Sequence, residues 1–173
     1  MNSDALTELA VRAQAGDRVA LSDFVRATQD DVWRVCAHLT SPAQADDVTQ
    51  EVYLRALRAL PRFRGDSSAR TWLLAIARHT AIDSVRSAVR RRRLLARTPV
   101  TEDTPDTAGG TDLDALVATL DPDRRTAFVL TQVVGCSYEE AAEICSCPVG
   151  TIRSRVARAR ADLVEALRRA DAT

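Results

Sequence analysis

The sequence contains no lysine, so arginine supplies all 24 of its basic side chains. It has no run of about 18 uninterrupted apolar residues, the length that a membrane-spanning helix needs. Its first residues lack a basic segment followed by an apolar one, so they are not typical of a secretory signal. These absences favour a cytoplasmic protein without a membrane span.

Motifs of catalysis and of metal binding are scarce as well. The two histidines, His38 and His79, are far apart in the sequence, and no glycine-rich phosphate loop or nucleophile–base pair accompanies them. Cys136, Cys145 and Cys147 lie near one another, but a structural zinc site usually has two matched pairs of ligands. A cytosolic chain keeps its thiols reduced, so we favour small buried thiols over a metal site. We expect no enzymatic activity, no metal and no cofactor.

Helical periodicity dominates the chain. Apolar residues recur at helical spacing almost throughout, and no segment has a convincing strand pattern. Residues 98–112 interrupt the periodicity with proline, glycine, threonine and acidic residues, a composition typical of a flexible linker. The sequence therefore predicts an all-α fold in which two small helical domains, residues 1–97 and 113–173, are joined by the flexible linker 98–112.

A helix-turn-helix is predicted in the second domain. Ser137 and Glu140 form a capping box that opens a short helix, and residues 146–148 make a tight turn before a long final helix. An apolar stripe of that final helix is expected to face the core: Ile152, Val156, Ala159, Leu163 and Leu167. The opposite face carries Thr151, Arg153, Ser154, Arg155 and Arg158.

The arginines of this face lie in the first turns of the helix. Positive charge near a helix N-terminus opposes the helix dipole, a cost that a phosphate-rich partner removes. Arginine also binds the O6 and N7 atoms of guanine in a bidentate manner. We therefore interpret the face as a DNA-reading surface; a solvated arginine face on a surface helix is the alternative.

A second basic segment ends the last helix of the first domain. It contains no acid and presents no apolar stripe to bury: Arg86, Arg90, Arg91, Arg92, Arg93 and Arg97. Such a run suits DNA phosphates, and a solvated helix end is the alternative. Trp72, Arg78 and His79 lie upstream on the same helix, where an aromatic ring beside basic residues can stack on an unpaired base. A buried tryptophan is nevertheless more common, so Trp33 and Trp72 are both expected in the core.

An acidic and polar face is expected on the helix that contains residues 46–52. Its members, spaced so that they share one side of the helix, are Asp46, Asp47, Gln50 and Glu51. This face is suited to docking a basic protein partner. Helix capping and solvation explain the same residues from composition alone, and that alternative stays open.

These segments resemble the sigma-70 family of RNA polymerase subunits, specifically its small extracytoplasmic-function (ECF) members, over nearly the whole chain. Residues 147–160 look like the recognition helix of region 4.2, and residues 46–56 look like region 2.2. Residues 63–68 and 71–78 look like regions 2.3 to 2.4. Two positions depart from the pattern: His79 is a less usual choice at a polar DNA-contacting position, and Ala157 replaces a side chain that is larger in some relatives.

The resemblance implies an RNA polymerase sigma factor of the ECF type, which binds core RNA polymerase and directs promoter-specific transcription initiation. The acidic face would bind the clamp helices of the beta-prime subunit, the beta flap would be a second contact, and the linker would thread the RNA exit path. The minus-ten element would be recognised and melted by Arg64, Ser67, Ser68, Trp72, Arg78, His79, Arg86 and Arg90. The minus-thirty-five element would be read by Thr151, Arg153, Ser154, Arg155 and Arg158. Family members are usually held inactive by an anti-sigma factor, which is a further candidate partner.

Two other classes of protein share part of this pattern. An ordinary helix-turn-helix regulator with a sensing or dimerising first domain explains the C-terminal features, but it needs neither the acidic face nor the basic segment. A scaffold or inhibitor-binding protein leaves both arginine surfaces unexplained. We therefore favour the sigma factor.

Overall fold

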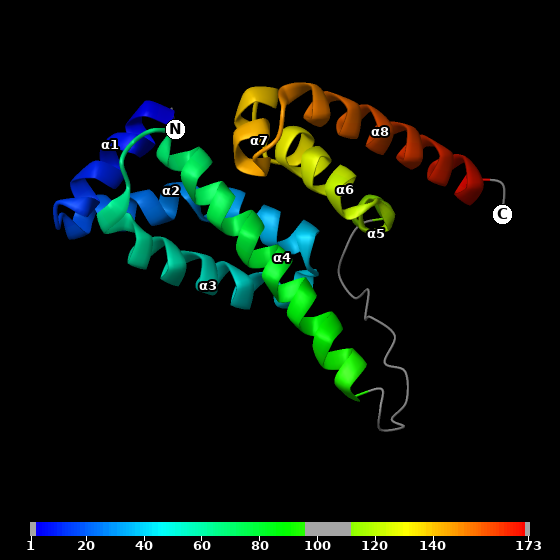
Figure 1. Cartoon of the computed structure of the whole chain (residues 1–173), viewed down its shortest axis with the longest axis horizontal. Coiled ribbons are helices and arrows are strands. Elements are labelled where there is room, and N and C mark those ends of the chain that lie inside the picture. Colours follow the sequence, from blue (N-terminus) through cyan, green and yellow to red (C-terminus); the bar gives the residue numbers. More distant parts are fainter. Residues whose placement is uncertain (1–2, 96–111, 172–173) are drawn as a thin grey trace.

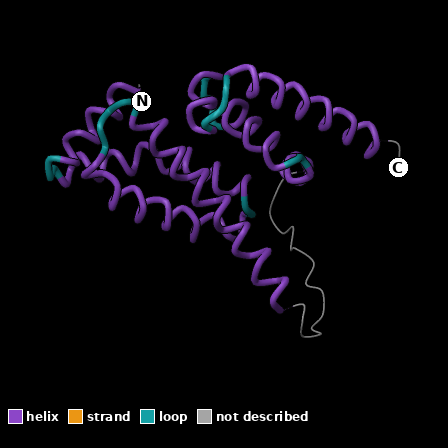
Figure 2. The backbone as a smooth tube through the Cα atoms, viewed as in Figure 1, coloured by secondary structure: helices purple, strands orange, loops and turns teal. Residues whose placement is uncertain are grey.

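The protein is described by a computed structural model that covers residues 3–95 and 112–171 and consists of helices joined by short turns (Figure 1). Within these ranges the backbone forms no strand, which confirms the predicted all-α class (Figure 2). The predicted linker lies outside the described residues except for Asp112, which begins a helix. No helix within the described ranges is both long and apolar enough to cross a bilayer.

The N-terminal lobe is built from helices that pack around α2. They are α1 (Ser3–Gln14), α2 (Arg18–Leu39), α3 (Pro42–Ala59) and α4 (Ala69–Leu95), with a 3₁₀ turn at Leu60–Arg62. Asp17 fixes the start of α2, because its carboxylate accepts hydrogen bonds from the backbone N–H groups of Val19 and Ala20 at 2.9 and 3.0 Å. Helix α2 contacts α1, α3 and α4 and buries Val32 and Val35 completely. This packing leaves the outer surfaces of α3 and α4 for other partners.

The C-terminal lobe contains the helix-turn-helix. Its helices are α5 (Asp112–Thr119), α6 (Pro122–Phe128) with a π-helical continuation at Val129–Val133, α7 (Tyr138–Cys145) and α8 (Val149–Asp171). The predicted capping box is confirmed. The N–H of Ser137 donates to Oε2 of Glu140 at 2.8 Å, and the N–H of Glu140 donates to Oγ of Ser137 at 3.0 Å. Ser146, with a left-handed φ of 52°, turns the chain from α7 into α8.

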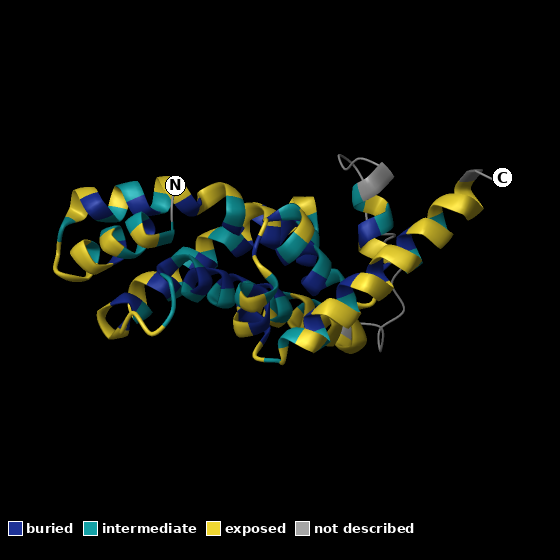
Figure 3. Cartoon of the chain, turned by 90° about the horizontal axis from the view of Figure 1, so that it is seen from above, coloured by how far each residue is buried: buried dark blue, intermediate teal, exposed yellow. Residues whose placement is uncertain are grey.

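The apolar stripe of α8 is confirmed only in part. Ile152, Val156, Ala159 and Leu163 are buried as expected. Leu167 is 46% exposed, so its predicted place in the core is wrong. Figure 3 shows the reason: the last turns of α8 extend beyond the helices that pack on it and are largely exposed.

The two lobes contact each other along α4 and α7, and also between α2 and the π-helical turn. Arg70 lies in this interlobe contact. Its Nε and Nη2 atoms lie 2.9 and 2.7 Å from Oδ2 of Asp31, and Nη2 also donates to the carbonyl oxygen of Val134 at 2.8 Å. The sulfur of Cys136 lies 3.6 Å from Nη1 of Arg70. Buried apolar residues of both lobes form one cluster, so the core is continuous across the contact.

Candidate nucleic-acid and polymerase interfaces

The exposed face of α8 carries Arg153, Ser154 and Arg158, as the sequence predicts. The hydroxyl of Ser154 donates to the carbonyl oxygen of Thr151 at 2.9 Å, and Thr151 itself is half-buried. Neither Arg153 nor Arg158 forms an ion pair with another residue of the described lobes. Both guanidinium groups are therefore available to an external anion or base edge.

Arg155 differs from its neighbours on α8. Its side chain is only 25% exposed, and it is ion-paired with Asp123 at the start of α6. A second guanidinium nitrogen lies 3.9 Å from the sulfur of Cys147. The sequence pattern groups Arg155 with the outward arginines, whereas the structure places it against the rest of the lobe.

The loop before α4 positions several of the predicted minus-ten residues. Arg64 is 83% exposed and lies 2.7 Å from a carboxylate oxygen of Asp66. The hydroxyl of Ser68 accepts from the backbone N–H of Thr71 at 3.1 Å and donates to its Oγ1 at 2.9 Å, so Ser68 stabilises the start of α4. Ser67 beside it is half-buried. The loop thus combines an exposed arginine, ion-paired with Asp66, with a serine engaged in capping.

Trp72 lies in the first turns of α4 and is half-buried. Its ring packs against Phe63, with the ring centroids 5.1 Å apart and the planes tilted by 50°. Leu21, Leu57 and Leu60 line the adjoining apolar crevice. The expectation of a core residue is therefore only partly met, because Trp72 keeps intermediate solvent exposure.

Helix α7 packs against α4, next to other predicted minus-ten residues. Arg78 is half-buried, its Nε has no hydrogen-bond partner among the described residues, and its Nη1 lies 3.4 Å from Nε2 of the exposed His79. Burial raises the pKa of Cys145, on α7, to about 11, and the nearby positive charge of Arg78 opposes that rise. The C-terminal lobe thus covers part of the α4 face.

The far end of α4 forms an exposed basic rod. Arg86 and Arg90 are exposed, as are the arginines at 91–93 that follow them. Arg97 lies outside the described residues. The rod projects away from the N-terminal lobe, where an extended polyanion can reach it (Figure 1).

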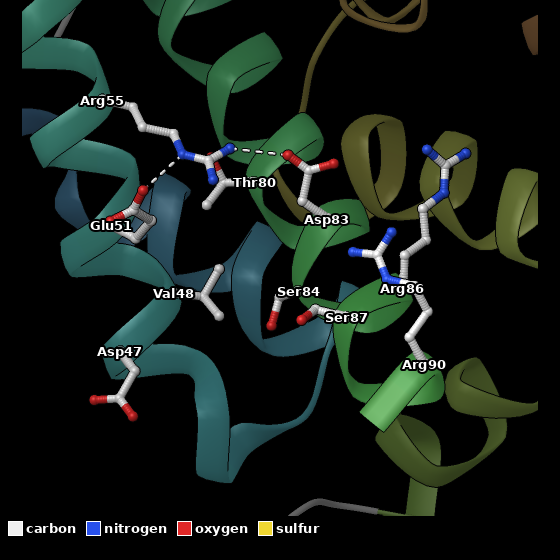
Figure 4. A pocket seen from close by; sticks show the side chains of 10 residues that line it. All are labelled: Asp47, Val48, Glu51, Arg55, Thr80, Asp83, Ser84, Arg86, Ser87 and Arg90. Carbon is white, nitrogen blue, oxygen red and sulfur yellow. Dashed lines mark hydrogen bonds and ion pairs between the residues drawn. The ribbon is translucent and has the colours of Figure 1, made fainter. Parts of the chain in front are cut away.

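The acidic residues of α3 occupy two neighbouring rows. Asp47 and Glu51 face α4, where they line an open groove of about 580 Å³ (Figure 4). Arg55 bridges this groove, with Nε 2.7 Å from Glu51 and Nη1 3.0 Å from Asp83 on α4. The hydrogen bonds to Glu51 and Asp83 raise the pKa of Arg55. Arg86 and Arg90 of α4 line the same groove from the other side, so predicted polymerase-binding and DNA-binding residues share one groove.

The other acidic row of α3 faces α2 and contacts Trp33, a residue that the sequence analysis placed in the core. Asp46 and Gln50 are exposed, and the indole N–H of Trp33 donates to Oδ1 of Asp46 at 2.8 Å. Trp33 is 42% exposed, so its predicted place in the core is wrong. A signal was present in the sequence, because the helical phase of the core residues Val32 and Val35 turns Trp33 away from the core.

The cysteines are consistent with the expected thiols. All four are free, and Cys36, Cys136 and Cys145 are buried. Burial raises the pKa of Cys36 and of Cys136 to about 11. Within residues 3–95 and 112–171, no group of histidine, cysteine or carboxylate side chains is arranged to hold a metal ion.

Family models match both lobes of the chain. The model described as Sigma-70 region 2 matches residues 24–91, which include α3 and most of α2 and α4. The model described as Sigma-70, region 4 matches residues 111–163, which include the helix-turn-helix. The chain belongs to the sigma-70 family.

Similar proteins place this sigma factor in the ECF group. It is 49% identical to the ECF RNA polymerase sigma factor SigC of Mycobacterium tuberculosis over 165 residues, 92% of this chain and 89% of that protein. It is 34% identical to the ECF RNA polymerase sigma-E factor of Escherichia coli K12, with 91% and 93% of the two chains covered.

Two solved structures are similar to the chain, and one of them is described as a sigma factor. RpoE from Bartonella quintana, in complex with the anti-sigma factor NepR, matches with a TM-score of 0.72 and 28% identity over 86% of this chain and 96% of that chain. CnrH, in complex with the cytosolic domain of CnrY, matches with a TM-score of 0.75 and 28% identity over 94% and 97% of the two chains.

This assignment settles the class of function. An ECF sigma factor binds core RNA polymerase and directs promoter-specific transcription initiation; it is an initiation factor and not an enzyme. The region 4 match on α7 and α8 agrees with a DNA-binding helix-turn-helix.

Proposed function

We propose that α8 of this sigma factor reads the minus-thirty-five element in the major groove. The observation that carries this proposal is that Arg153 and Arg158, beside Ser154 on the exposed face of α8, form no ion pair within the described lobes. A bidentate arginine–guanine contact discriminates against the wrong base by about 1–3 kcal/mol. Thr151, at the start of α8, contacts the DNA backbone. Arg155 joins them by exchanging Asp123 for a phosphate, because Asp123 is 57% exposed and water can take over its solvation.

The N-terminal lobe would recognise and melt the minus-ten element. Arg64, Ser67 and Ser68 belong to the loop before α4, and the half-buried Trp72 lies in the first turns of that helix. Unpaired bases can stack on the face of such an aromatic ring. Arg78, His79, Arg86 and Arg90 would follow the DNA backbone along α4. Because α7 packs against α4, the lobes have to separate before both elements are bound.

The acidic face of α3 would dock core RNA polymerase at the clamp helices of its beta-prime subunit. Asp46, Asp47 and Gln50 are exposed and Glu51 is half-buried, so the face presents carboxylates on both sides of the helix ridge. Opposite charges across an interface accelerate association and fix the register of docking. The beta flap would contact the C-terminal lobe.

The setting of the protein follows from the same proposal. Because core polymerase and promoter DNA are in the bacterial cytoplasm, the protein acts there. RpoE of Bartonella quintana was solved with the anti-sigma factor NepR. We include an anti-sigma factor of this kind among the partners of the present chain, with the two lobes as its binding surface. The boundaries 1–97 and 113–173 remain the proposed division into region 2 and region 4.

Run-off transcription with purified core polymerase on a promoter library tests the proposal. Wild type should start RNA synthesis at defined sites, and the charge reversals Asp47→Arg and Glu51→Arg should abolish initiation together with polymerase binding. Arg153→Ala with Arg158→Ala should abolish dependence on the minus-thirty-five sequence while polymerase binding persists. If the isolated chain binds a promoter tightly and core polymerase gains no promoter specificity, the ordinary regulator is the better explanation.

A further inference from the structure

Helix α1 contacts both ends of the loop that joins α3 to α4, and the proposed function assigns this helix no role (Figure 1). The side-chain amide of Gln14, the last residue of α1, donates to three backbone carbonyl oxygens where the chain enters the loop: Leu60 at 3.1 Å, Pro61 at 3.2 Å and Phe63 at 2.9 Å. With its NH2 group toward these carbonyls, the amide shares two hydrogens among three acceptors. One side chain of α1 thus fixes the start of the loop.

The end of the loop is held by the same helix. The backbone N–H of Ala69, the first residue of α4, donates to Oγ1 of Thr7 at 3.0 Å. The hydroxyl of Thr7 directs its own hydrogen to the carbonyl oxygen of Ser3 at 2.9 Å, which leaves its lone pairs for Ala69. Because Ala69 is 0% exposed, a free donor at this helix start would be buried without a partner.

The spacing of the two contacts on α1 matches the helical repeat. Thr7 and Gln14 are seven residues apart, about two turns, so they lie on one face of α1 and about 10 Å apart along its axis. Between the two contacts, residues 64–67 form no backbone hydrogen bond with the other described residues. The conformation of this segment therefore depends on where α1 holds its ends.

We infer that Thr7 and Gln14 are positioning residues for minus-ten recognition, because they hold the ends of the loop so that residues 64–67 present a preformed site to an unpaired base. The inference rests on the proposed role of this loop in recognising the minus-ten element. Neither side chain has to touch DNA. If the receiving site were not already formed, the cost of ordering the loop would be added to the cost of unstacking the base.

The packing of α1 supports this role. Leu6 and Ala10 are 3% and 0% exposed and belong to the core, so α1 is anchored independently of the loop. The helix precedes residues 24–91, which the region 2 model matches, so the family assignment gives it no role. A purely stabilising contribution from Thr7 and Gln14 would lower activity on every promoter alike. A positioning role changes the preference for one base.

Transcription with core polymerase and the full chain tests the inference on promoters that carry single-base changes throughout the minus-ten element. Arg64→Ala identifies the position that the loop reads, because the preference at that position should be lost. Gln14→Ala should lower the ratio of matched to mismatched initiation there by about 10-fold, since the loop has to be ordered when the base binds. Gln14→Glu has the same size but cannot donate, so it should show the same defect. Binding of core polymerase should equal that of wild type in both variants.

A matched pair of variants tests the other end of the loop. Thr7→Ser keeps the acceptor for Ala69 and should retain the wild-type base preference. Thr7→Val has nearly the same shape without the hydroxyl and should lower the preference by about 5-fold. The control is Glu8→Ala, which truncates an exposed side chain of α1 and should change nothing. Circular dichroism checks folding, and if Gln14→Ala does not fold, Gln14→Glu and the Thr7 pair decide.

The outcomes separate this inference from the proposed function. If Arg64→Ala removes the preference for one base while Gln14→Ala and Thr7→Val keep it, the loop reads the base without α1 and the inference is wrong. It is also wrong if Gln14→Ala lowers initiation equally on all promoters, because that result reports a loss of stability alone. If Arg64→Ala leaves every base preference intact, the proposed role of the loop fails first, and the inference fails with it.

Discussion

Replacing Arg70 by alanine is expected to loosen the interlobe contact without unfolding either lobe. Arg70 lies on α4 of the N-terminal lobe, and its hydrogen bond to the carbonyl oxygen of Val134 crosses to the C-terminal lobe. Its side chain is 17% exposed, so solvent screens this bond only partly. The bonds to Asp31 stay within the N-terminal lobe and do not contribute directly to the contact.

The expected magnitude follows from that single charged hydrogen bond. Such bonds contribute about 1.5–3 kcal/mol. A loss of about 2 kcal/mol lowers the population ratio of closed to open molecules about 30-fold, because 1.36 kcal/mol corresponds to a factor of ten. Cys136 lies beside Arg70 and is 6% exposed, so its accessibility should rise in proportion to the population of open molecules.

Thiol alkylation under native conditions, followed by mass spectrometry, measures this change. Cys36 is an internal standard, because it is buried in the N-terminal lobe and its pKa, like that of Cys136, is about 11. The positive charge of Arg70 lowers the pKa of Cys136, so its removal alone would slow alkylation. A rate increase at Cys136 therefore reports opening of the contact and not a change in thiol acidity.

The control for this experiment is Arg26→Ala, which breaks an ion pair that is exposed on the N-terminal lobe. It should leave the alkylation of both cysteines unchanged. The reasoning would be refuted if Arg70→Ala left Cys136 as protected as in wild type, or if Cys36 and Cys136 became reactive together, since the second result reports unfolding of a lobe.

Three further predictions follow from single sites. Ser137→Ala removes the cap of α7 and should lower the free energy of unfolding of the C-terminal lobe by about 1 kcal/mol in denaturant titrations; no change would mean that the capping box contributes nothing. Arg153→Ala and Arg158→Ala should each weaken holoenzyme binding to the matched minus-thirty-five element by about 1–3 kcal/mol in competition assays, whereas Arg168→Ala, on the same helix, should not. Burial lowers the pKa of His38, so the unfolded chain binds a proton first and stability should fall as the pH drops below about 6.5. The thermal midpoint of His38→Gln should fall less than that of wild type as the pH drops below about 6.5. If the variant and wild type show the same pH dependence, His38 is not the group responsible.

Sequence reasoning succeeded where the physics is local. The capping box at Ser137 depends on residues three positions apart, and the buried stripe from Ile152 to Leu163 depends on the period of a single helix. Both are confirmed by the structure. The outward phase of Arg153 and Arg158 follows from the same period.

The remaining features depend on neighbours that are remote in the sequence. Arg155 is held by Asp123, 32 residues away, and Arg70 donates to Val134, 64 residues away. Leu167 has the right helical phase for burial, but it is exposed because the end of α8 extends beyond the helices of the described C-terminal lobe (Figure 3). Periodicity states which side of a helix a residue occupies; it does not state what, if anything, lies opposite.

The hydrogen bond to the carbonyl group of Val134 can break and re-form when the two lobes separate and meet again. Carbonyls at the end of a helix have no partner within the helix, and here the guanidinium of Arg70 supplies one. When the lobes part, a water molecule can occupy that acceptor, and the guanidinium keeps its carboxylate partner in its own lobe. Opening the contact at Arg70 therefore leaves neither lobe with a buried polar group that lacks a hydrogen-bond partner.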